Sequence, residues 1–214
     1  QYTYYEPGVA DPLNPPLFAD QIEVPVFLAG QWQDEQTGPH FATLIDKFTN
    51  VPAIRSILTN GLHADGYSPN VISEWVSFLQ LYVSQEVPYV DPASAAYSSE
   101  LFSAFLGTPV ALPTLPFSDE DIPGITYEEA KSGFESQPPV RVIFENGYGP
   151  AAIGAPVGAF DLEFSQYPPL ETVALRLYMN ADGSLRSTPP EEEQSASSYL
   201  HDPEAGRRTF GGSQ

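Results

Sequence analysis

The sequence predicts an α/β fold: part of a parallel sheet with flanking helices, followed by an incomplete antiparallel β-sandwich. Three observations carry this prediction. Residues 22–29 form a nearly unbroken apolar run that ends at Gly30, as a strand buried on both faces does. Residues 41–48 place apolar side chains at helical spacing. Beyond residue 138 the apolar period changes from about four to two, which is typical of antiparallel strands.

The segment 21–68 reads as a β-α-β unit. Its first strand is 22–29, its crossover helix occupies about 41–48 and stops at Asn50-Val51-Pro52, and its second strand is 54–58. Parallel strands joined by a crossover helix end at the same edge of a sheet, so the loops that follow them are neighbours. We therefore expect these two loops to share one crevice.

Asp34 and His63 lie in these two loops. A carboxylate that contacts an imidazole holds its tautomer and stabilises the imidazolium, so the histidine acts as a general base. We therefore predict that Asp34 and His63 are the catalytic acid and base of one site. Glu35 is the competing carboxylate. His40 is interpreted as a structural residue, and His201 has no predicted partner.

Several segments resemble one family. Residues 31–34 (QWQD) and 61–66 (GLHADG), each after a strand, resemble the acid and histidine segments of α/β-hydrolases, and most closely the cocaine esterase and X-Pro dipeptidyl-peptidase-like (CocE/NonD) hydrolases. Residues 138–142, 174–178 and 198–203 look like the start of the jelly roll that follows the catalytic domain in that family.

This resemblance implies a domain organisation and roles. Residues 1–137 would be the C-terminal part of an α/β-hydrolase domain with a helical segment, and residues 138–214 the start of a jelly-roll-like sandwich. In this family a tryptophan precedes the triad aspartate, as Trp32 precedes Asp34 here. Trp32 would wall the acyl pocket, although packing explains it equally well.

The nucleophile is missing from the sequence. A Gly-x-Ser-x-Gly elbow is absent, and the nearest match, residues 66–69, lacks the second glycine; helix capping explains Ser68 better. In α/β-hydrolases the order along the chain is serine, acid, histidine, so the serine would precede residue 1. The chain also opens on Gln1 in a Pro- and Tyr-rich loop, and two parallel strands do not complete a sheet. We expect it to be the C-terminal part of a larger enzyme.

The remaining elements follow from periodicity and caps. Helices are expected from Pro69 to about Val83, from about 94 to 106, and from Thr126, where Glu129 completes a capping box. Alternation predicts sandwich strands at 140–144, 160–164 and 172–179, and residues 180–183 form the turn of a hairpin.

Charge and composition exclude several classes of partner. The chain carries 28 acidic against 8 basic residues, a formal charge of −20, which disfavours nucleic acid and anionic membranes. No apolar stretch is long enough to span a bilayer. The absence of cysteine excludes disulfides and thiolate metal sites. We expect neither cofactor nor metal; the run 119–121 (DED) is interpreted as solvated, with calcium binding as the alternative.

The sequence thus predicts part of a serine hydrolase that cleaves carboxylic esters or amides through an acyl-enzyme. Its partners would be a small ester or amide substrate and the N-terminal part that carries the nucleophile. The alternative is a non-catalytic binding or structural protein that uses a β-sandwich as its interaction domain. Oligomeric state is left open, a homo-oligomer included. A cysteine-free, acidic, lysine-poor chain is compatible with secretion, the location we favour.

Overall fold

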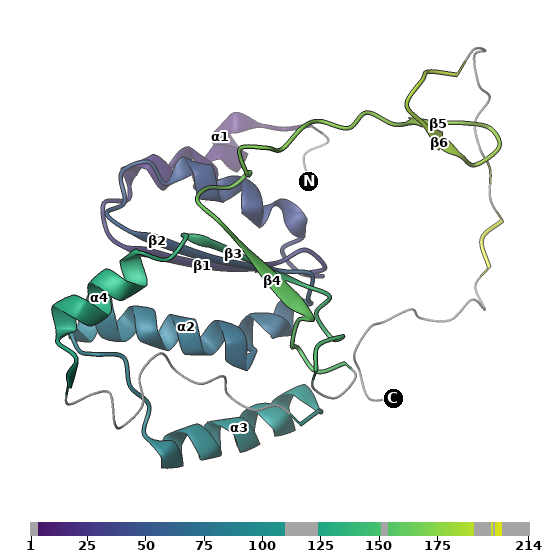
Figure 1. Ribbon diagram of the computed structural model, residues 1–214. Helices are drawn as coiled ribbons and strands as arrows, with labels where there is room; N and C mark the ends of the chain where they lie inside the picture. The colour runs from purple at the N-terminus through teal and green to yellow at the C-terminus, as the bar shows by residue number, and fades with distance from the viewer. Residues whose placement is uncertain (1–3, 110–123, 151–153, 191–197, 199, 203–214) are drawn as a thin grey trace. The chain divides into compact units, whose positions relative to one another are not determined.

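The protein is described here from a computed structural model, shown in Figure 1. The structure describes residues 4–109, 124–150, 154–190, 198 and 200–202. The chain divides into two compact units, residues 1–170 and 171–214, and each is treated by itself.

The first unit is built on a four-stranded mixed sheet in the order β1-β2-β3-β4 (Figure 1). Strands β1 (Val26–Gln31), β2 (Ile54–Thr59) and β3 (Val140–Phe144) are parallel, and β4 (Phe160–Phe164) runs antiparallel to β3. The pairing of β1 with β2 is in register over six residues, from Val26 opposite Ile54 to Gln31 opposite Thr59. The predicted β-α-β unit and its parallel strands are confirmed.

Helical segments cover both faces of this sheet (Figure 1). On one face, the 3₁₀ helix η4 (Pro39–Lys47) forms the crossover and buries Ile45 against Leu58 and Val140. On the other face, Val71 of helix α2 (Pro69–Leu79) packs against Ile57 and Ile143. Strands β2 and β3 are therefore buried on both sides, as their apolar content requires.

The remaining helical elements of the first unit are short or peripheral. Short turns precede the sheet: α1 (Pro7–Ala10), η1 (Asp11–Leu13), η2 (Pro15–Leu17) and η3 (Ala19–Gln21). After β2 come η5 (His63–Tyr67), α2, the π-helical turn η6 (Gln80–Ser84), α3 (Pro92–Leu106) and α4 (Tyr127–Glu135). The capping box predicted at Thr126 and Glu129 is present at α4.

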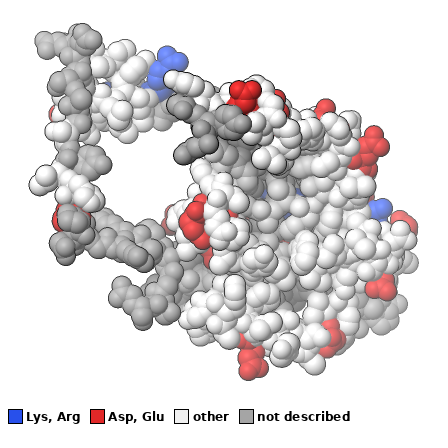
Figure 2. Space-filling view, turned by 180° about the vertical axis from the view of Figure 1, so that it is seen from behind, with Lys and Arg blue, Asp and Glu red and all other residues white. Residues whose placement is uncertain are grey.

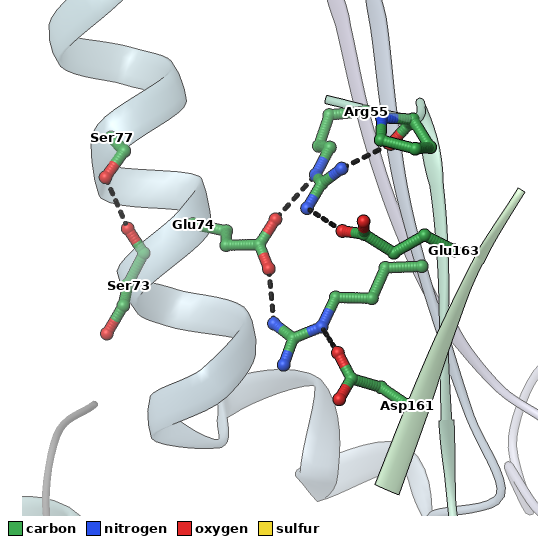
Figure 3. Close-up of polar contacts among 8 residues, drawn as sticks. Arg55, Ser73, Glu74, Ser77, Asp161 and Glu163 are labelled. Carbon is green, nitrogen blue, oxygen red and sulfur yellow. Dashed lines mark hydrogen bonds and ion pairs between the residues drawn. The ribbon is translucent and has the colours of Figure 1, made fainter. Parts of the chain in front are cut away.

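A cluster of ion pairs ties α2 to the sheet (Figure 3). Glu74 of α2 accepts hydrogen bonds from Arg55 of β2, at 2.6 Å, and from Arg141 of β3. Arg141 also pairs with Asp161 of β4. Arg55 is only 3% exposed and donates in addition to the carbonyl of Pro138. One carboxylate thus fixes a helix to two neighbouring strands, and each guanidinium has a second acceptor.

Two predictions about the second half of the chain were wrong. Residues 140–144 form a strand as expected, but it pairs parallel to β2 in the main sheet and is not part of a sandwich. Strand β4 belongs to the same sheet, so the compact unit continues to Leu170, past the boundary predicted at residues 137/138. The period-two pattern was misleading because it indicated that Arg141 faces solvent. In the fold, Glu74 and Asp161 neutralise the Arg141 guanidinium.

The second unit contains little regular structure among its described residues. A two-stranded antiparallel sheet joins β5 (Tyr178–Met179) to β6 (Leu185–Arg186), and the predicted turn at residues 180–183 connects them. Gly183 adopts φ +79° there and donates its N–H to the Asn180 carbonyl. Residues 172–177, predicted to be strand, form no strand. The predicted jelly-roll sandwich is not present in the part of this unit that the structure describes.

Acidic side chains are spread over the surface, and on the face shown in Figure 2 carboxylates stand among uncharged residues with few basic groups between them. Across the described ranges, every helix is too short or too polar to cross a lipid bilayer.

The ion-pair cluster makes a prediction about stability. Glu74→Gln removes the charge that Arg55 and Arg141 share and leaves a buried guanidinium short of its counter-ion. Breaking a buried pair in this way costs about 3–5 kcal/mol of unfolding free energy. Urea denaturation at neutral pH, followed by circular dichroism, measures this loss.

Glu163→Gln is the matched control. Glu163 also pairs with Arg55, at 3.7 Å, but the Glu163 side chain is 42% exposed. Exposed pairs contribute about 1 kcal/mol or less. Equal losses for the two variants would contradict the assignment of Glu74 as the central residue of the cluster.

Candidate active site

The end of β1 brings Asp34 to the sheet edge. The backbone stays paired past the strand, because Trp32 donates to the Thr59 carbonyl at 2.9 Å and Gln33 donates to the Gly61 carbonyl at 3.1 Å. The chain then turns, with the N–H of Asp34 donating to the Gln31 carbonyl at 3.2 Å. Asp34 is therefore fixed relative to β2, the strand that leads to His63.

Hydrogen bonds surround the Asp34 carboxylate, whose side chain is only 4% exposed. Its Oδ1 accepts from the backbone N–H groups of Gln36 and Thr37, at 2.7 and 2.9 Å. Its Oδ2 accepts from the Thr37 hydroxyl at 2.8 Å. The loop after β1 thus satisfies one oxygen fully and leaves the second directed towards the loop after β2.

The loop after β2 is held by Asp65. The Asp65 carboxylate accepts hydrogen bonds from the N–H of Leu62, at 2.8 Å, and from the side-chain amide of Asn146, at 3.0 Å. Burial raises the pKa of Asp65 despite these two bonds, and the charge of Glu35 acts in the same direction. A Cβ at Gly61 would lie 2.2 Å from Asp65 Oδ2, so only glycine fits before the histidine turn.

The two loops meet in a hydrogen bond of 2.8 Å between His63 Nδ1 and Asp34 Oδ2. Burial by itself would raise the pKa of Asp34, but hydrogen bonds from the Thr37 N–H, His63, the Gln36 N–H and the Thr37 hydroxyl outweigh it and hold this pKa far below its usual range. An ionised carboxylate can only accept, so Nδ1 of His63 must carry the proton. In the neutral ring Nε2 then has a free lone pair, which is what a general base requires.

A cavity of about 360 Å³ opens beside this pair. His63 lies at its wall, 37% of its side chain is exposed, and within the described residues no hydrogen bond engages its Nε2. The lining is mainly apolar and comes from β1, the two loops, η4 and α2: Phe27, Ala29, Gly30, Gln31, Asp34, Thr37, Phe41, His63, Gly66, Tyr67, Val71, Ile72 and Trp75. Neither Lys nor Arg is among these residues.

The structure brings two of the predicted site residues together and places the others elsewhere. Asp34 and His63 are in contact as predicted, whereas the competing carboxylate Glu35 reaches only the backbone N–H of His63, at 3.3 Å. Trp32 does not line the cavity. Its side chain lies on the η4 face, where it packs against Phe41 with ring centroids 5.9 Å apart. Side chains alternate along β1, so Trp32 belongs to the core on this face and packing accounts for it.

Sequence reasoning did not identify the cavity's own aromatic residues. Tyr67 and Trp75 flank the histidine loop and α2, and Phe27 lies on β1. Trp75 fits the apolar stripe of α2, a period that predicts a side chain packed on the sheet, yet it is 44% exposed. Only its exposure distinguishes Trp75 from a core residue, and the helical period of the sequence carries no information about exposure. Ser68 begins α2 with its backbone carbonyl, but its side chain makes no capping hydrogen bond.

Metal ligands do not cluster in the described part of the chain, where no three His, Asp or Glu side chains lie close enough to share an ion. The acidic run 119–121 falls outside the described residues.

Comparison with known proteins adds no assignment, since no family model, curated protein or solved structure matches this chain.

The low pKa of Asp34 predicts a pH-dependent contribution to stability. A carboxyl whose pKa is depressed in the folded state stabilises fully above its unfolded value of 3.8 and progressively less as pH falls towards the folded value. The difference in unfolding free energy between the wild type and Asp34→Asn should therefore shrink as the pH falls below about 4. Denaturation series between pH 2.5 and 7 measure it, and Asp46→Asn, at an exposed carboxylate, corrects for the loss of one charge. A difference that grows on acidification contradicts the assignment.

Proposed function

We propose that this chain supplies the acid and base of a serine hydrolase that cleaves carboxylic esters or amides through an acyl-enzyme. The observation that carries the proposal is the 2.8 Å contact between an ionised, buried carboxylate and a histidine that lines an apolar cavity. The resemblance of residues 31–34 and 61–66 to CocE/NonD hydrolases supports the same reaction class. The nucleophilic serine belongs to a polypeptide segment outside residues 1–214.

In this mechanism His63 transfers protons at Nε2. The serine oxygen attacks the substrate carbonyl carbon while its proton passes to Nε2, and the same proton then goes to the departing alcohol or amine as the acyl-enzyme forms. In the second half, water attacks the acyl carbon and gives a proton to Nε2. The bond between the acyl carbon and the serine oxygen then breaks, and Nε2 returns the proton to that oxygen as the acid product leaves. Asp34 keeps Nδ1 protonated and stabilises the positive charge on the ring at each step. The oxyanion hole would come from the segment that carries the serine.

The apolar lining of the cavity supports an acyl or leaving group without negative charge. Phe27, Tyr67 and Trp75 give it aromatic walls, and the carboxylate of Asp34 disfavours an anion. On the same resemblance, the β5–β6 hairpin would be part of an antiparallel jelly roll.

A second candidate is a binding protein without catalysis, and helix α3 favours it. Tyr97, Leu101 and Phe105 follow one another at four-residue spacing and are 67%, 54% and 63% exposed, which makes an apolar stripe. Such stripes commonly mark interaction surfaces. A fluorophosphonate probe applied to the intact source protein distinguishes the candidates, because only the hydrolase holds an activated serine.

The hydrolase proposal predicts that purified residues 1–214 do not cleave nitrophenyl esters, since the sequence supplies the acid and the base but contains no Gly-x-Ser-x-Gly elbow. Hydrolysis by this chain alone that His63→Ala abolishes would contradict the proposal. Spectrophotometric assay of nitrophenolate release measures this hydrolysis.

In the intact source protein, Asp34→Asn should lower kcat by about 10⁴-fold, the cost of losing the tautomer partner, and His63→Ala by about 10⁶-fold, the cost of losing the base. His40→Ala, at an exposed histidine, is the control and should retain activity. Full activity in either site variant would rule out the assigned roles.

A further inference from the structure

The cavity wall that β1 forms is apolar except at the last residue of the strand. Phe27, Ala29 and Gln31 all line the cavity, and they lie on one face of the sheet because side chains alternate along a strand. Phe27 and Ala29 pack in the apolar cluster that faces α2. Gln31 ends the strand, three residues before Asp34. This wall therefore changes from apolar to polar as it approaches the contact between Asp34 and His63.

The side-chain amide of Gln31 lacks the hydrogen bond that its burial calls for. Gln31 is only 5% exposed, and its Nε2 makes no hydrogen bond to the residues that the structure describes. The amide lies against Gly66 of the histidine turn, where an added Cβ would be 3.1 Å from Nε2. A buried donor without an acceptor is unfavourable, and most buried polar groups in proteins have a partner. The position of this donor in the cavity wall indicates that its acceptor belongs to a bound molecule.

Thr59 is a second buried polar residue beside Gln31 and offers an internal alternative. The register of β1 and β2 places the two residues opposite each other. The Thr59 hydroxyl also has no hydrogen-bond partner in the described ranges, and Thr59 is 3% exposed. The two side chains thus share a face of the sheet without bonding to each other. Of the two, only Gln31 lines the cavity, so only its amide is within reach of a ligand.

The chemistry of the wall defines the group that this donor would bind. The last torsion of a glutamine side chain is soft, so the amide can turn its N–H towards the cavity without a movement of β1. An N–H pairs with an oxygen acceptor, such as a carbonyl, ether or hydroxyl oxygen. A carboxylate is less suitable, because the ionised Asp34 lines the same cavity and neither Lys nor Arg does. The matching group is therefore a neutral oxygen at one end of an apolar body.

We propose that the cavity binds an apolar group that carries a neutral oxygen acceptor, and that Gln31 donates a hydrogen bond from Nε2 to this oxygen. The apolar part lies along Phe27 and Ala29, and the oxygen lies at the end of β1 beside the histidine turn. One further step rests on the proposed function: the acyl or leaving group of the substrate holds this oxygen in addition to those of the reacting ester or amide. Gln31 then determines specificity, because it favours such substrates over hydrocarbon groups of the same shape.

Three small molecules of nearly the same shape test this recognition. The first, 4-phenylbutan-2-one, carries a neutral carbonyl; 2-methyl-4-phenylbut-1-ene has a methylene group in place of its oxygen, and 3-phenylpropanoate has a charged oxygen in place of its methyl group. Equilibrium dialysis against an excess of residues 1–214 measures each Kd below the solubility limit of the alkene. The ketone should bind more tightly than the carboxylate. In NMR spectra the ketone, but not the alkene, should move the Gln31 Nε2 protons downfield.

Gln31→Met removes the donor and keeps an unbranched side chain of similar length. This variant should weaken binding of the ketone relative to the alkene by about tenfold, the contribution of one hydrogen bond to a buried donor. Thr59→Val is the matched control, because it removes the other unpartnered polar group outside the cavity, and it should leave the ratio of the two Kd values unchanged. Since Nε2 has no partner to lose among the described residues, Gln31→Met should unfold at a urea concentration equal to or above that of the wild type.

Several outcomes overturn the inference. The ketone does not bind, binds without moving the Gln31 amide signals, or binds more weakly than the carboxylate. The ratio of the ketone and alkene Kd values is the same in Gln31→Met as in the wild type, or Thr59→Val changes it equally. A lower urea midpoint for Gln31→Met would show that the amide has a structural partner.

Binding of these probes requires no nucleophile, so a failure here leaves the kcat measurements on the intact source protein unaffected. Conversely, full activity of the His63→Ala or Asp34→Asn variant would remove the hydrolase proposal. It would leave a measured preference of Gln31 for the ketone in place, as a property of a binding cavity.

Discussion

The parallel pairing of β1 with β2 is the constraint on which the candidate site depends. The register sets Gln31 opposite Thr59, and the paired backbone continues to Gln33 and Gly61. The two loops therefore leave the sheet side by side, and a carboxylate and an imidazole 29 positions apart come within 2.8 Å. A shift of one residue in the register would turn side chains to the opposite face and separate the pair.

Ion pairs hold the helix that follows the histidine turn, and hydrogen bonds fix the two loops that form the site. Glu74 holds α2 against β2 and β3, and α2 begins directly after the turn that bears His63. Asp65 fixes that turn from the inside. Around Asp34, three donors besides the histidine keep the carboxylate ionised where burial alone would favour its neutral form. The histidine thus receives a single tautomer, which is the chemical requirement for a base.

Sequence reasoning predicted the strands next to the site better than the strands beyond it. The buried run of β1 and the Asn-Val-Pro helix stop left few alternatives for residues 21–68. Strand β3 was predicted but misplaced, because alternation around Arg141 resembles a strand with one solvent face. The pattern does not distinguish an exposed arginine from one that Glu74 and Asp161 neutralise, and those partners lie 67 and 20 positions away.

The sequence by itself determined the local elements, the capping box at Thr126 and the expectation that Asp34 and His63 meet, because these follow from periodicity, turn chemistry and the geometry of a crossover. Only the tertiary structure decided which tryptophan lines the cavity and that β3 and β4 complete the same sheet. These features depend on contacts between distant residues: Trp32 packs against Phe41, Trp75 remains exposed and Arg141 is neutralised only once the chain is folded.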